Sequence, residues 1–366
     1  MLTMHPTLLI GPSDWQPAHM PREEFARRID ALWRRDRQAE RAIVYGTSHR
    51  HAELAYFTNT VPKLEAVAAL LSRTGEHRLF VGGGVNMLDA ARPLTFITQL
   101  SPLRELVDVI RPGGSIRRTL LVGADTMPLA FRRNLMEAAG SGEAVQDATG
   151  HVWNAMRRKS PAELAAIRDA MAVIDAARAV MLTALRSGAT VTEVISAGEL
   201  AANAAGAQDM RTLLSCDGGR TLRPFAGRSR ERPDPLLLYV AVRKFNYWAD
   251  RFLVLSLQRK PSSIQEKAGG VLKFIVAAVR AGTPVRGIEA LIANSLAPYR
   301  PHPLAARAFA QRMGLALHEP PRTDIGPTFE EGEVYSVRVG ATDGGRQHAI
   351  CSEMLAWSPQ GGASAP

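Results

Sequence analysis

The chain has 366 residues, of which 46% are hydrophobic and 22% charged, the composition of a globular protein with the length of two ordinary domains. No stretch approaches the roughly 20 apolar residues that span a membrane, and the N-terminus lacks a secretion-signal pattern, so we expect a soluble, cytoplasmic protein without a membrane partner. The net charge of +10 comes from scattered arginines rather than one basic run, which argues against a nucleic-acid partner but leaves open a basic pocket for an anionic small molecule.

Short apolar runs alternate with helical stretches in residues 1–154. We expect strands at Ala42–Tyr45, Arg78–Val81 and Thr119–Val122, and helices at Glu23–Arg41 and Leu64–Leu71. This alternation is typical of a small α/β domain.

A second domain is predicted over residues 155–360, where a long helix begins. Ser160, Pro161 and Glu163 supply an N-cap serine, a proline at the first helical position and a glutamate that can close a capping box. The helical pattern stops at Ser187-Gly188. Residues 361–366 are rich in glycine and alanine and are expected to form a flexible tail.

A faint internal repeat suggests that the second domain has two similar halves. Residues 186–191 (RSGATV) are echoed by residues 280–285 (RAGTPV), and each segment follows a long helical stretch. Two further segments are rich in β-type residues, 236–257 and 334–357. The first predicts a hairpin that brings Tyr239 and Asp250 to one face.

Three segments of this domain carry a resemblance to a known family: Lys159–Leu164, Phe245–Asp250 and Gly314–Pro321. Their order and spacing resemble the pita-bread family of methionine aminopeptidase, Xaa-Pro dipeptidase, aminopeptidase P and creatinase. Residues 44–46 and 52–58 resemble the first strand and turn of the creatinase-type N-terminal domain. The resemblance implies an α/β (α+β) fold with a creatinase-like N-terminal domain, a pita-bread domain of two pseudo-symmetric halves, and a homodimer.

The resemblance also implies a dinuclear metal centre with two aspartates, one histidine and two glutamates as ligands. Position by position, only the second aspartate is kept, as Asp250, while the other four positions hold Tyr239, Gln311, Arg338 and His348. One carboxylate beside an arginine cannot hold two divalent cations, so we expect neither a metal centre nor another cofactor. A single zinc or iron bound weakly by Asp250 and His348 stays open.

Creatinase cleaves a C–N bond without metal, by the resemblance through a histidine whose place is taken here by Phe225. Its mechanism therefore cannot transfer intact. The family's substrate-contacting histidine persists as His318, and its arginine before the last ligand as Arg346. The candidate catalytic residues are His318, Asp250, His348 and Tyr239, and the candidate substrate-binding residues are Arg338, Arg346, Gln311 and Phe225.

Each candidate also has a structural interpretation. Arg338 either forms an internal ion pair with Asp250 or binds a substrate carboxylate, and His318 is either an acid/base or a structural hydrogen-bonding residue. Cys351 lies three residues from His348 on a predicted strand, so the two side chains should point to opposite faces and form no dyad.

Three functions remain compatible with this sequence. The leading hypothesis is a metal-independent enzyme that hydrolyses, eliminates or cyclises a small polar or anionic substrate at a C–N group, because polar rather than apolar residues replace the lost ligands. The second is a non-catalytic pseudo-peptidase that binds a peptide or protein. The third is a metallopeptidase whose ligands are shifted in sequence.

Overall fold

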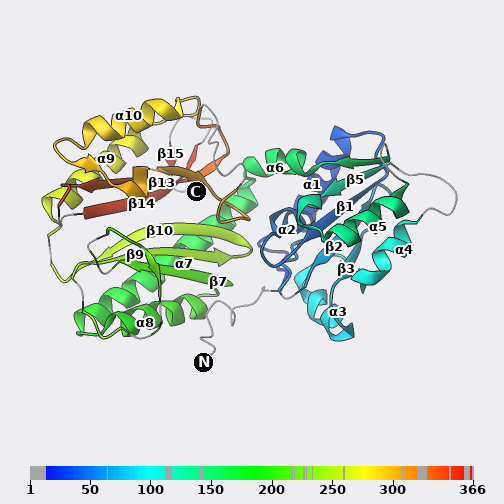
Figure 1. The fold of residues 1–366 in the computed structure, drawn as a ribbon, viewed down its shortest axis with the longest axis horizontal. Coiled ribbons are helices and arrows are strands. Elements are labelled where there is room, and N and C mark those ends of the chain that lie inside the picture. Colours follow the sequence, from blue (N-terminus) through cyan, green and yellow to red (C-terminus); the bar gives the residue numbers. More distant parts are fainter. Residues whose placement is uncertain are drawn as a thin grey trace. The chain divides into compact units, whose positions relative to one another are not determined.

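A computed structural model describes residues 14–364, with gaps at residues 64, 112–117, 141–143, 216, 218, 226, 228, 233, 259, 307–308, 320–327, 346–347 and 358–362. The chain divides between Met156 and Arg157 into two compact units (Figure 1). None of the described helices is long and apolar enough to cross a membrane.

The N-terminal unit is built on one mixed sheet with the strand order β4-β3-β2-β1-β5-β6. Its strands are β1 (Arg41–Gly46), β2 (Val67–Ser72), β3 (Arg78–Val81), β4 (Gln99–Pro102), β5 (Thr119–Val122) and β6 (Val145–Asp147). Its helices are α1 (Arg22–Arg35), α2 (Ala52–Thr58), α3 (Val85–Ala91), α4 (Leu106–Ile110), α5 (Leu129–Ala139) and α6 (Thr149–Arg157). Alternate residues of β1, Ile43 and Tyr45, pack in one hydrophobic core with α4 and α5, and α1 and α2 lie on the other side of the sheet (Figure 1). The α/β prediction for this unit is confirmed.

Two helix predictions in this unit need correction. The helix expected at Glu23–Arg41 ends at Arg35, because the Asp36 carboxylate accepts the backbone N–H groups of Gln38 and Ala39 and turns the chain. The helix expected at Leu64–Leu71 is wrong, since Val67–Ser72 is strand β2 between β1 and β3. Its alanines and leucines favour a helix locally, but pairing on both edges outweighs that preference.

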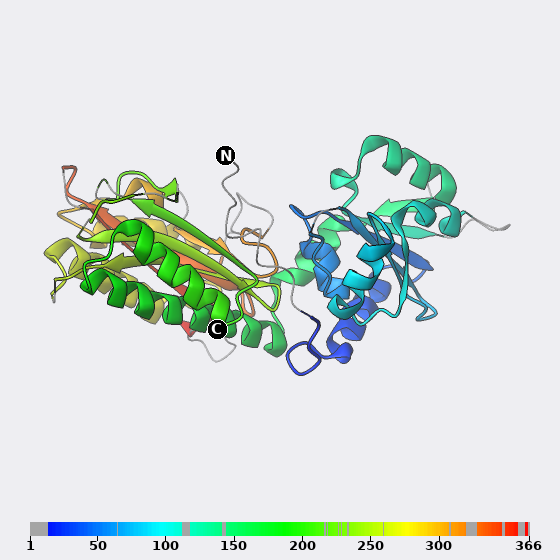
Figure 2. The ribbon, with the colours of Figure 1, turned by 90° about the horizontal axis from the view of Figure 1, so that it is seen from below.

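The C-terminal unit contains two halves of similar build. The first has α7 (Pro161–Arg186), α8 (Val191–Ala204) and a sheet of β7 (Asp209–Ser215), β8 (Arg223–Pro224), β9 (Leu236–Lys244) and β10 (Tyr247–Leu255). The second has α9 (Ser263–Ala278), α10 (Val285–Ser295), α11 (Pro303–Ala306) and a sheet of β11 (Arg300–Pro301), β12 (Ala310–Arg312), β13 (Val334–Thr342), β14 (His348–Trp357) and β15 (Ala363–Ser364). Figure 1 shows both sheets between the helix pairs α7/α8 and α9/α10. Figure 2 shows α7 and α8, coloured green, from below.

The faint repeat falls at the same place in each half. Gly188, between α7 and α8, and Gly282, between α9 and α10, both have a positive φ, 82° and 85°. This left-handed conformation suits glycine and lets the chain reverse between two packed helices. The prediction of two pseudo-symmetric halves is therefore confirmed.

Helix α7 begins as expected. The Ser160 hydroxyl accepts the Glu163 backbone N–H, the Glu163 carboxylate accepts the Ser160 N–H, and Pro161 is the first helical residue. The helix ends at Arg186 with Ser187 as C-cap, also as expected. In the tail expected to be flexible at 361–366, Ala363 and Ser364 instead form β15 and pair with β14, and the rest of that segment lies outside the described residues.

Candidate functional site

The site begins at the hairpin of β9 and β10. Its turn residues Phe245 and Asn246 both have a positive φ, 48° and 69°, which matches the twist of a tight two-residue hairpin. The register pairs Tyr239 with Phe252, so Asp250 lies diagonally across from Tyr239 on the same face. The predicted hairpin and the common face of Tyr239 and Asp250 are confirmed.

Tyr239, Asp250 and Arg338 form one hydrogen-bonded network. Oδ2 of Asp250 accepts a hydrogen bond from the Tyr239 hydroxyl at 2.8 Å and one from the Arg338 guanidinium at 2.6 Å. Asp250 is 1% exposed and Arg338 8%. Burial, reinforced by the Asp250 carboxylate, raises the pKa of Tyr239, so its phenol stays protonated and acts as the donor. Of the two interpretations of Arg338, the structure shows the ion pair.

This network does not fit a metal centre. A dinuclear centre would need a second carboxylate next to Asp250, but the Arg338 guanidinium lies there. Its positive charge would repel a metal cation. In the part of the chain that the structure describes, no group of three or more His, Cys, Asp or Glu side chains is arranged to hold a metal ion. The residues present thus disagree with the dinuclear centre that the resemblance implies.

Gln311 lies at the edge of the same face, on β12 and opposite Ser336 of β13. Its side-chain amide donates to the backbone carbonyl of Leu317 at 3.0 Å. That bond ties the loop that carries His318 to the sheet. His318 itself is exposed.

Two of the segments that carry the resemblance meet in a buried ion pair. Lys159 Nζ lies 2.7 Å from Oε2 and 2.9 Å from Oε1 of Glu319, and both side chains are almost fully buried. A Cβ on Gly314 would lie only 2.1 Å from the Glu319 carboxylate and 2.9 Å from Lys159 Nζ. The glycine is therefore needed for this pair, which fixes the position of the loop after β12.

His348 lies at the far end of the face, away from the network. The register of β13 and β14 places Ser352, not His348, opposite Arg338, while His348 pairs with Thr342. Four residues along a strand correspond to roughly 13 Å. The structure therefore does not bring His348 to Asp250, and this also weighs against a metal ion shared by those two residues.

His348 packs instead against His302, which sequence reasoning missed. The ring centroids are 5.2 Å apart in an edge-on arrangement. A Cβ on Gly219 would lie 3.2 Å from His348 Cβ, and one on Gly340 would lie 2.7 Å from His302 Cβ, so both glycines leave room for the pair. Burial and the neighbouring His348 lower the pKa of His302 to about 4, so His302 is neutral near pH 7.

Two cysteines, Phe225 and Arg346 remain among the residues considered from the sequence. Cys351 is on the opposite face of β14 from His348, as expected, and packs against the helix-side core. Burial raises the pKa of its thiol to about 12, so Cys351 is a poor nucleophile. Phe225 directly follows β8 and is half-buried. Arg346 and Cys216 lie outside the described residues.

Several buried polar atoms on the site face have no hydrogen-bond partner among the described residues. They are Asp250 Oδ1, Arg338 Nε, Ser336 Oγ, and both ring nitrogens of His348. Ser336, Arg338 and Thr342 lie on one face of β13, because side chains alternate along a strand. His348 pairs with Thr342 and therefore lies on the same face. Buried polar groups are normally satisfied, so this face is suited to a polar ligand.

Ser336 was also missed by sequence reasoning, although a signal existed. In Ser336-Val337-Arg338 the period-two alternation places the serine on the face of a residue already singled out. For His302 there was no such signal, because it lies in a short connection between β11 and α11.

The sequence matches no family model and no curated protein. The fold, in contrast, is similar to solved structures over nearly the whole chain. An X-Pro aminopeptidase from Thermotoga maritima matches with a TM-score of 0.76, 16% identity, and coverage of 93% of this chain and 96% of its own. The prolidase of Pyrococcus horikoshii gives 0.71, 15%, 93% and 97%, and aminopeptidase P of E. coli gives 0.72, 15%, 94% and 94%. The chain therefore has the pita-bread fold, with the N-terminal unit that accompanies it in these proteins.

Proposed function

We propose that this protein is a metal-independent enzyme that binds a small polar or anionic molecule on the remodelled sheet face and acts on its C–N group. The observation that carries the proposal is the set of buried polar atoms without partners on that face. Leaving such a group unpaired costs about 1–3 kcal/mol, so a fold that keeps several together gains from a ligand that satisfies them.

The unpaired atoms define the ligand's chemistry. Arg338 Nε is a charged donor, Asp250 Oδ1 an acceptor and Ser336 Oγ both. A molecule with a carboxylate or carbonyl oxygen and a nearby N–H matches this pattern. Amides, amidines and amino acids combine these groups.

The roles follow from position. Tyr239 holds Asp250, Asp250 orients an N–H group of the substrate, and Arg338 binds an oxyanion. Arg346, which lies outside the described residues, is proposed from the sequence as a second cation. Gln311 positions the loop that brings in His318, and Phe225 forms an apolar wall. His318 is the candidate for proton transfer to or from the C–N group, because a neutral imidazole accepts a proton at one nitrogen and donates from the other. Hydrolysis, elimination and cyclisation all need such a transfer. His348, predicted from the sequence as catalytic, is too far along the strand from Arg338 for this role and is instead a polar contact for the far end of the ligand.

A non-catalytic pseudo-peptidase is favoured by one observation. Oδ2 of Asp250 is fully engaged by Tyr239 and Arg338, so the only retained family ligand is used to hold the structure together. In this alternative the face binds a peptide without catalysing a reaction on it. A metallopeptidase with shifted ligands is not supported, because the described residues offer no alternative ligand cluster.

The test is a thermal-shift screen of the metal-free protein with guanidinoacetate, N-acetylglycine and free amino acids, followed by NMR of the incubated ligand. We expect at least one class to raise Tm, because a ligand that binds only the folded state stabilises it. Ser336→Ala and His348→Asn should reduce that shift. Turnover seen by NMR supports the enzyme, and His318→Ala should then abolish it without unfolding the protein.

Cys351→Ala is the matched control, because it lies three residues from His348 on the opposite face of the same strand. It should leave the ligand-induced shift unchanged. The proposal fails if no compound class shifts Tm, or if Cys351→Ala weakens the shift as much as His348→Asn. Binding of peptides without turnover would support the pseudo-peptidase instead.

A further inference from the structure

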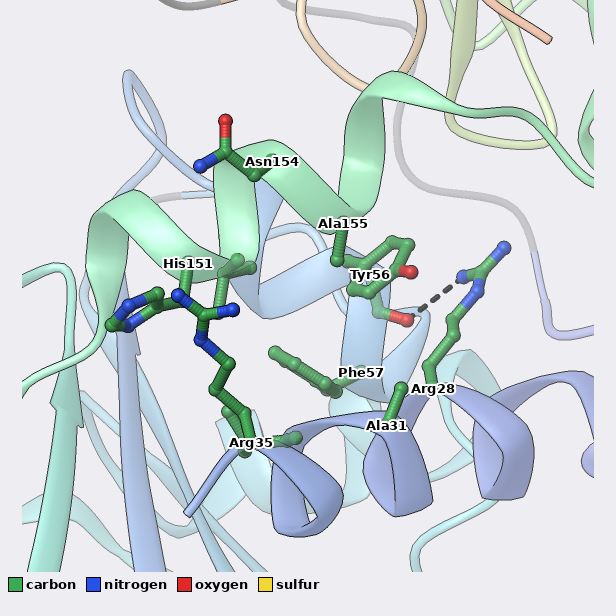
Figure 3. Close-up of a pocket in the computed structure, with 10 residues that line it drawn as sticks. Arg28, Ala31, Arg35, Tyr56, Phe57, His151, Asn154 and Ala155 are labelled. Atoms are coloured by element: carbon green, nitrogen blue, oxygen red, sulfur yellow. Dashed lines mark hydrogen bonds between the residues drawn. The ribbon is translucent and has the colours of Figure 1, made fainter.

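A cavity lies within the N-terminal unit, between α1, α2 and α6 (Figure 3). Its volume is about 280 Å³, and Leu32, Arg35, Phe57, His151 and Val152 are among the residues that line it. A neighbouring hollow of about 400 Å³ shares Leu32, Arg35 and His151 with it. Both volumes are close to those of pockets that hold small organic molecules.

The floor of the cavity is apolar. Leu32, Phe57 and Val152 are 6%, 1% and 2% exposed. Phe57 belongs to α2, whose seven residues are all buried and which carries the sequence that resembles creatinase-type N-terminal domains. An apolar or aromatic ligand body would therefore bury its surface here at a gain of about 25 cal/mol per Å².

The walls are fixed by hydrogen bonds between the helices. Arg28, 1% exposed, donates to the Tyr56 carbonyl at 2.8 Å, which joins α1 to α2 (Figure 3). It also donates to the Glu24 carboxylate of its own helix at 3.0 Å. Trp153 Nε1 donates to Glu53, which joins α6 to α2. The cavity is thus formed before a ligand arrives, which reduces the entropic cost of binding.

Two donor groups face the cavity, one on the exposed side chain of Arg35 and one on the half-buried side chain of His151. The Arg35 guanidinium and the His151 ring lie side by side at one end of it, whereas Asn154 points away (Figure 3). Neither side chain has a hydrogen-bond or ion-pair partner among the described residues. Arg28, on the same helix, shows the contrast, since its guanidinium is hydrogen-bonded to the Glu24 carboxylate and the Tyr56 carbonyl.

The nearby acidic residue does not neutralise this end. Asp36 lines the neighbouring hollow, but its carboxylate accepts the Arg118 guanidinium at 3.0 Å and the backbone N–H groups of Gln38 and Ala39 at 2.9 and 3.1 Å. Arg37 adds a further cation to the lining of that hollow. The local charge is therefore positive.

We infer that this cavity binds a small organic anion, in which a carboxylate or phosphate meets Arg35 and His151 and an apolar or aromatic body rests on Leu32, Phe57 and Val152. Arginine suits the anionic end because its planar fork donates two parallel hydrogen bonds to an oxyanion. This site is separate from the sheet face of the C-terminal unit. Binding in this cavity does not depend on a reaction at that face.

The experiment is isothermal titration calorimetry of the full chain with phenylacetate, phenyl phosphate and the neutral 2-phenylacetamide. We expect saturable binding of at least one anion and binding of the amide weakened about tenfold or more. A preference between the two anions tells a carboxylate ligand from a phosphate ligand. Arg35→Gln should weaken anion binding about tenfold, because it removes the charge-assisted bonds.

Arg34→Gln is the matched control, since Arg34 and Arg35 are both exposed on the same helix but only Arg35 lines the cavity. It should leave binding unchanged. Ala155→Trp, at an exposed position of the cavity lining, should block binding by filling the space. Ser336→Ala and His348→Asn, on the other site, should have no effect.

The inference is overturned if neither anion binds at millimolar concentration, or if the amide binds as well as the anions. Equal losses in Arg34→Gln and Arg35→Gln would show a diffuse charge effect rather than a site. Retained binding in Ala155→Trp would place the ligand elsewhere. These outcomes do not depend on whether the proposed enzyme activity is found.

Discussion

At the scale of single residues, the groups around Asp250 determine what its carboxylate can do. This carboxylate is buried and accepts hydrogen bonds from the Arg338 guanidinium and the Tyr239 phenol. Removing both charges from water is costly, and only close pairing compensates for it. The network thus depends on each partner more than an exposed ion pair would.

The first prediction concerns this dependence. Arg338→Met should destabilise the C-terminal unit by about 3–5 kcal/mol, because it leaves the buried Asp250 carboxylate without its cation. Adding Asp250→Asn to that variant should recover part of the loss, since the uncompensated charge is then removed. Urea denaturation of the wild type, both single variants and the double variant measures the coupling.

Arg251→Met provides the control, one residue from Asp250 on β10. Its ion pairs with Asp175 and Glu353 are solvent-exposed on the acidic side, 53% and 37%, so their loss should cost about 0–1 kcal/mol. If the stability losses of Asp250→Asn and Arg338→Met simply added up in the double variant, the two residues would not be energetically coupled.

Residue by residue, the sequence predicted part of this site. The spacing of Tyr239 and Asp250 on two strands of a tight hairpin fixed their common face, because the turn allows one register. The placement of His348 in one site with Asp250 could not succeed in the same way. Asp250 is on β10 and His348 on β14, and no local motif gives the position of two strands so far apart in the chain.

At the scale of elements, α7 and α8 begin with the same device but in different surroundings. Both have a capping box, with Ser160 and Glu163 in one and Thr190 and Glu193 in the other. Glu163 is 1% exposed and also accepts the Tyr247 hydroxyl at 3.0 Å, which ties α7 to the hairpin. Glu193 is exposed and bonds only within its own helix start.

The second prediction uses this contrast. Glu163→Ala should lower the free energy of unfolding by about 1–3 kcal/mol, because it leaves the buried Tyr247 hydroxyl unsatisfied as well as the cap. Glu163→Gln should recover part of that loss, since the amide oxygen still accepts. Chemical denaturation followed by circular dichroism gives both values.

Glu193→Ala is the internal comparison, and we expect a smaller effect from it because water replaces the lost bonds at an exposed helix start. If the two alanine variants lost the same stability, the Tyr247 contact would contribute nothing beyond the cap.

At the scale of the whole molecule, the pita-bread fold is present although the positions that the resemblance assigns to metal ligands hold Tyr239, Gln311, Arg338 and His348 beside Asp250. Each half buries its own helix-to-sheet core, as Val337 and Val339 do against α9 and α10. The core faces of the strands are thus separate from the face that carried the ligands. Ligand loss and fold stability can therefore vary independently.

The third prediction follows from that separation. Dialysis against a chelator should leave Tm unchanged, and elemental analysis of the purified protein should find no stoichiometric manganese, cobalt, iron or zinc. A metal-dependent fold would instead lose stability, because bound metal contributes by mass action. Two metal equivalents per chain would refute metal independence and restore the metallopeptidase alternative.

The homodimer and the cytoplasmic location stay predictions at this scale. Light scattering of the full chain would measure the oligomeric state directly.

The sequence by itself determined the elements whose signals are local: the capped start of α7, the tight hairpin, and the repeated helix turn at Gly188 and Gly282. Capping, turn geometry and side-chain alternation act between residues close in the chain, so they can be recognised without the fold. The prediction that metal ligands are replaced also rests on the sequence alone, since it needs only residue types at the spacings that the resemblance implies.

Only the tertiary structure decided what depends on contacts between distant segments. Strand β2 forms because β1 and β3 pair with it, although its composition favours a helix. His302 meets His348, and Arg35 meets His151, across connections whose path no local rule sets. Pairing and packing energies of this kind belong to the assembled molecule, so the two candidate sites became visible only there.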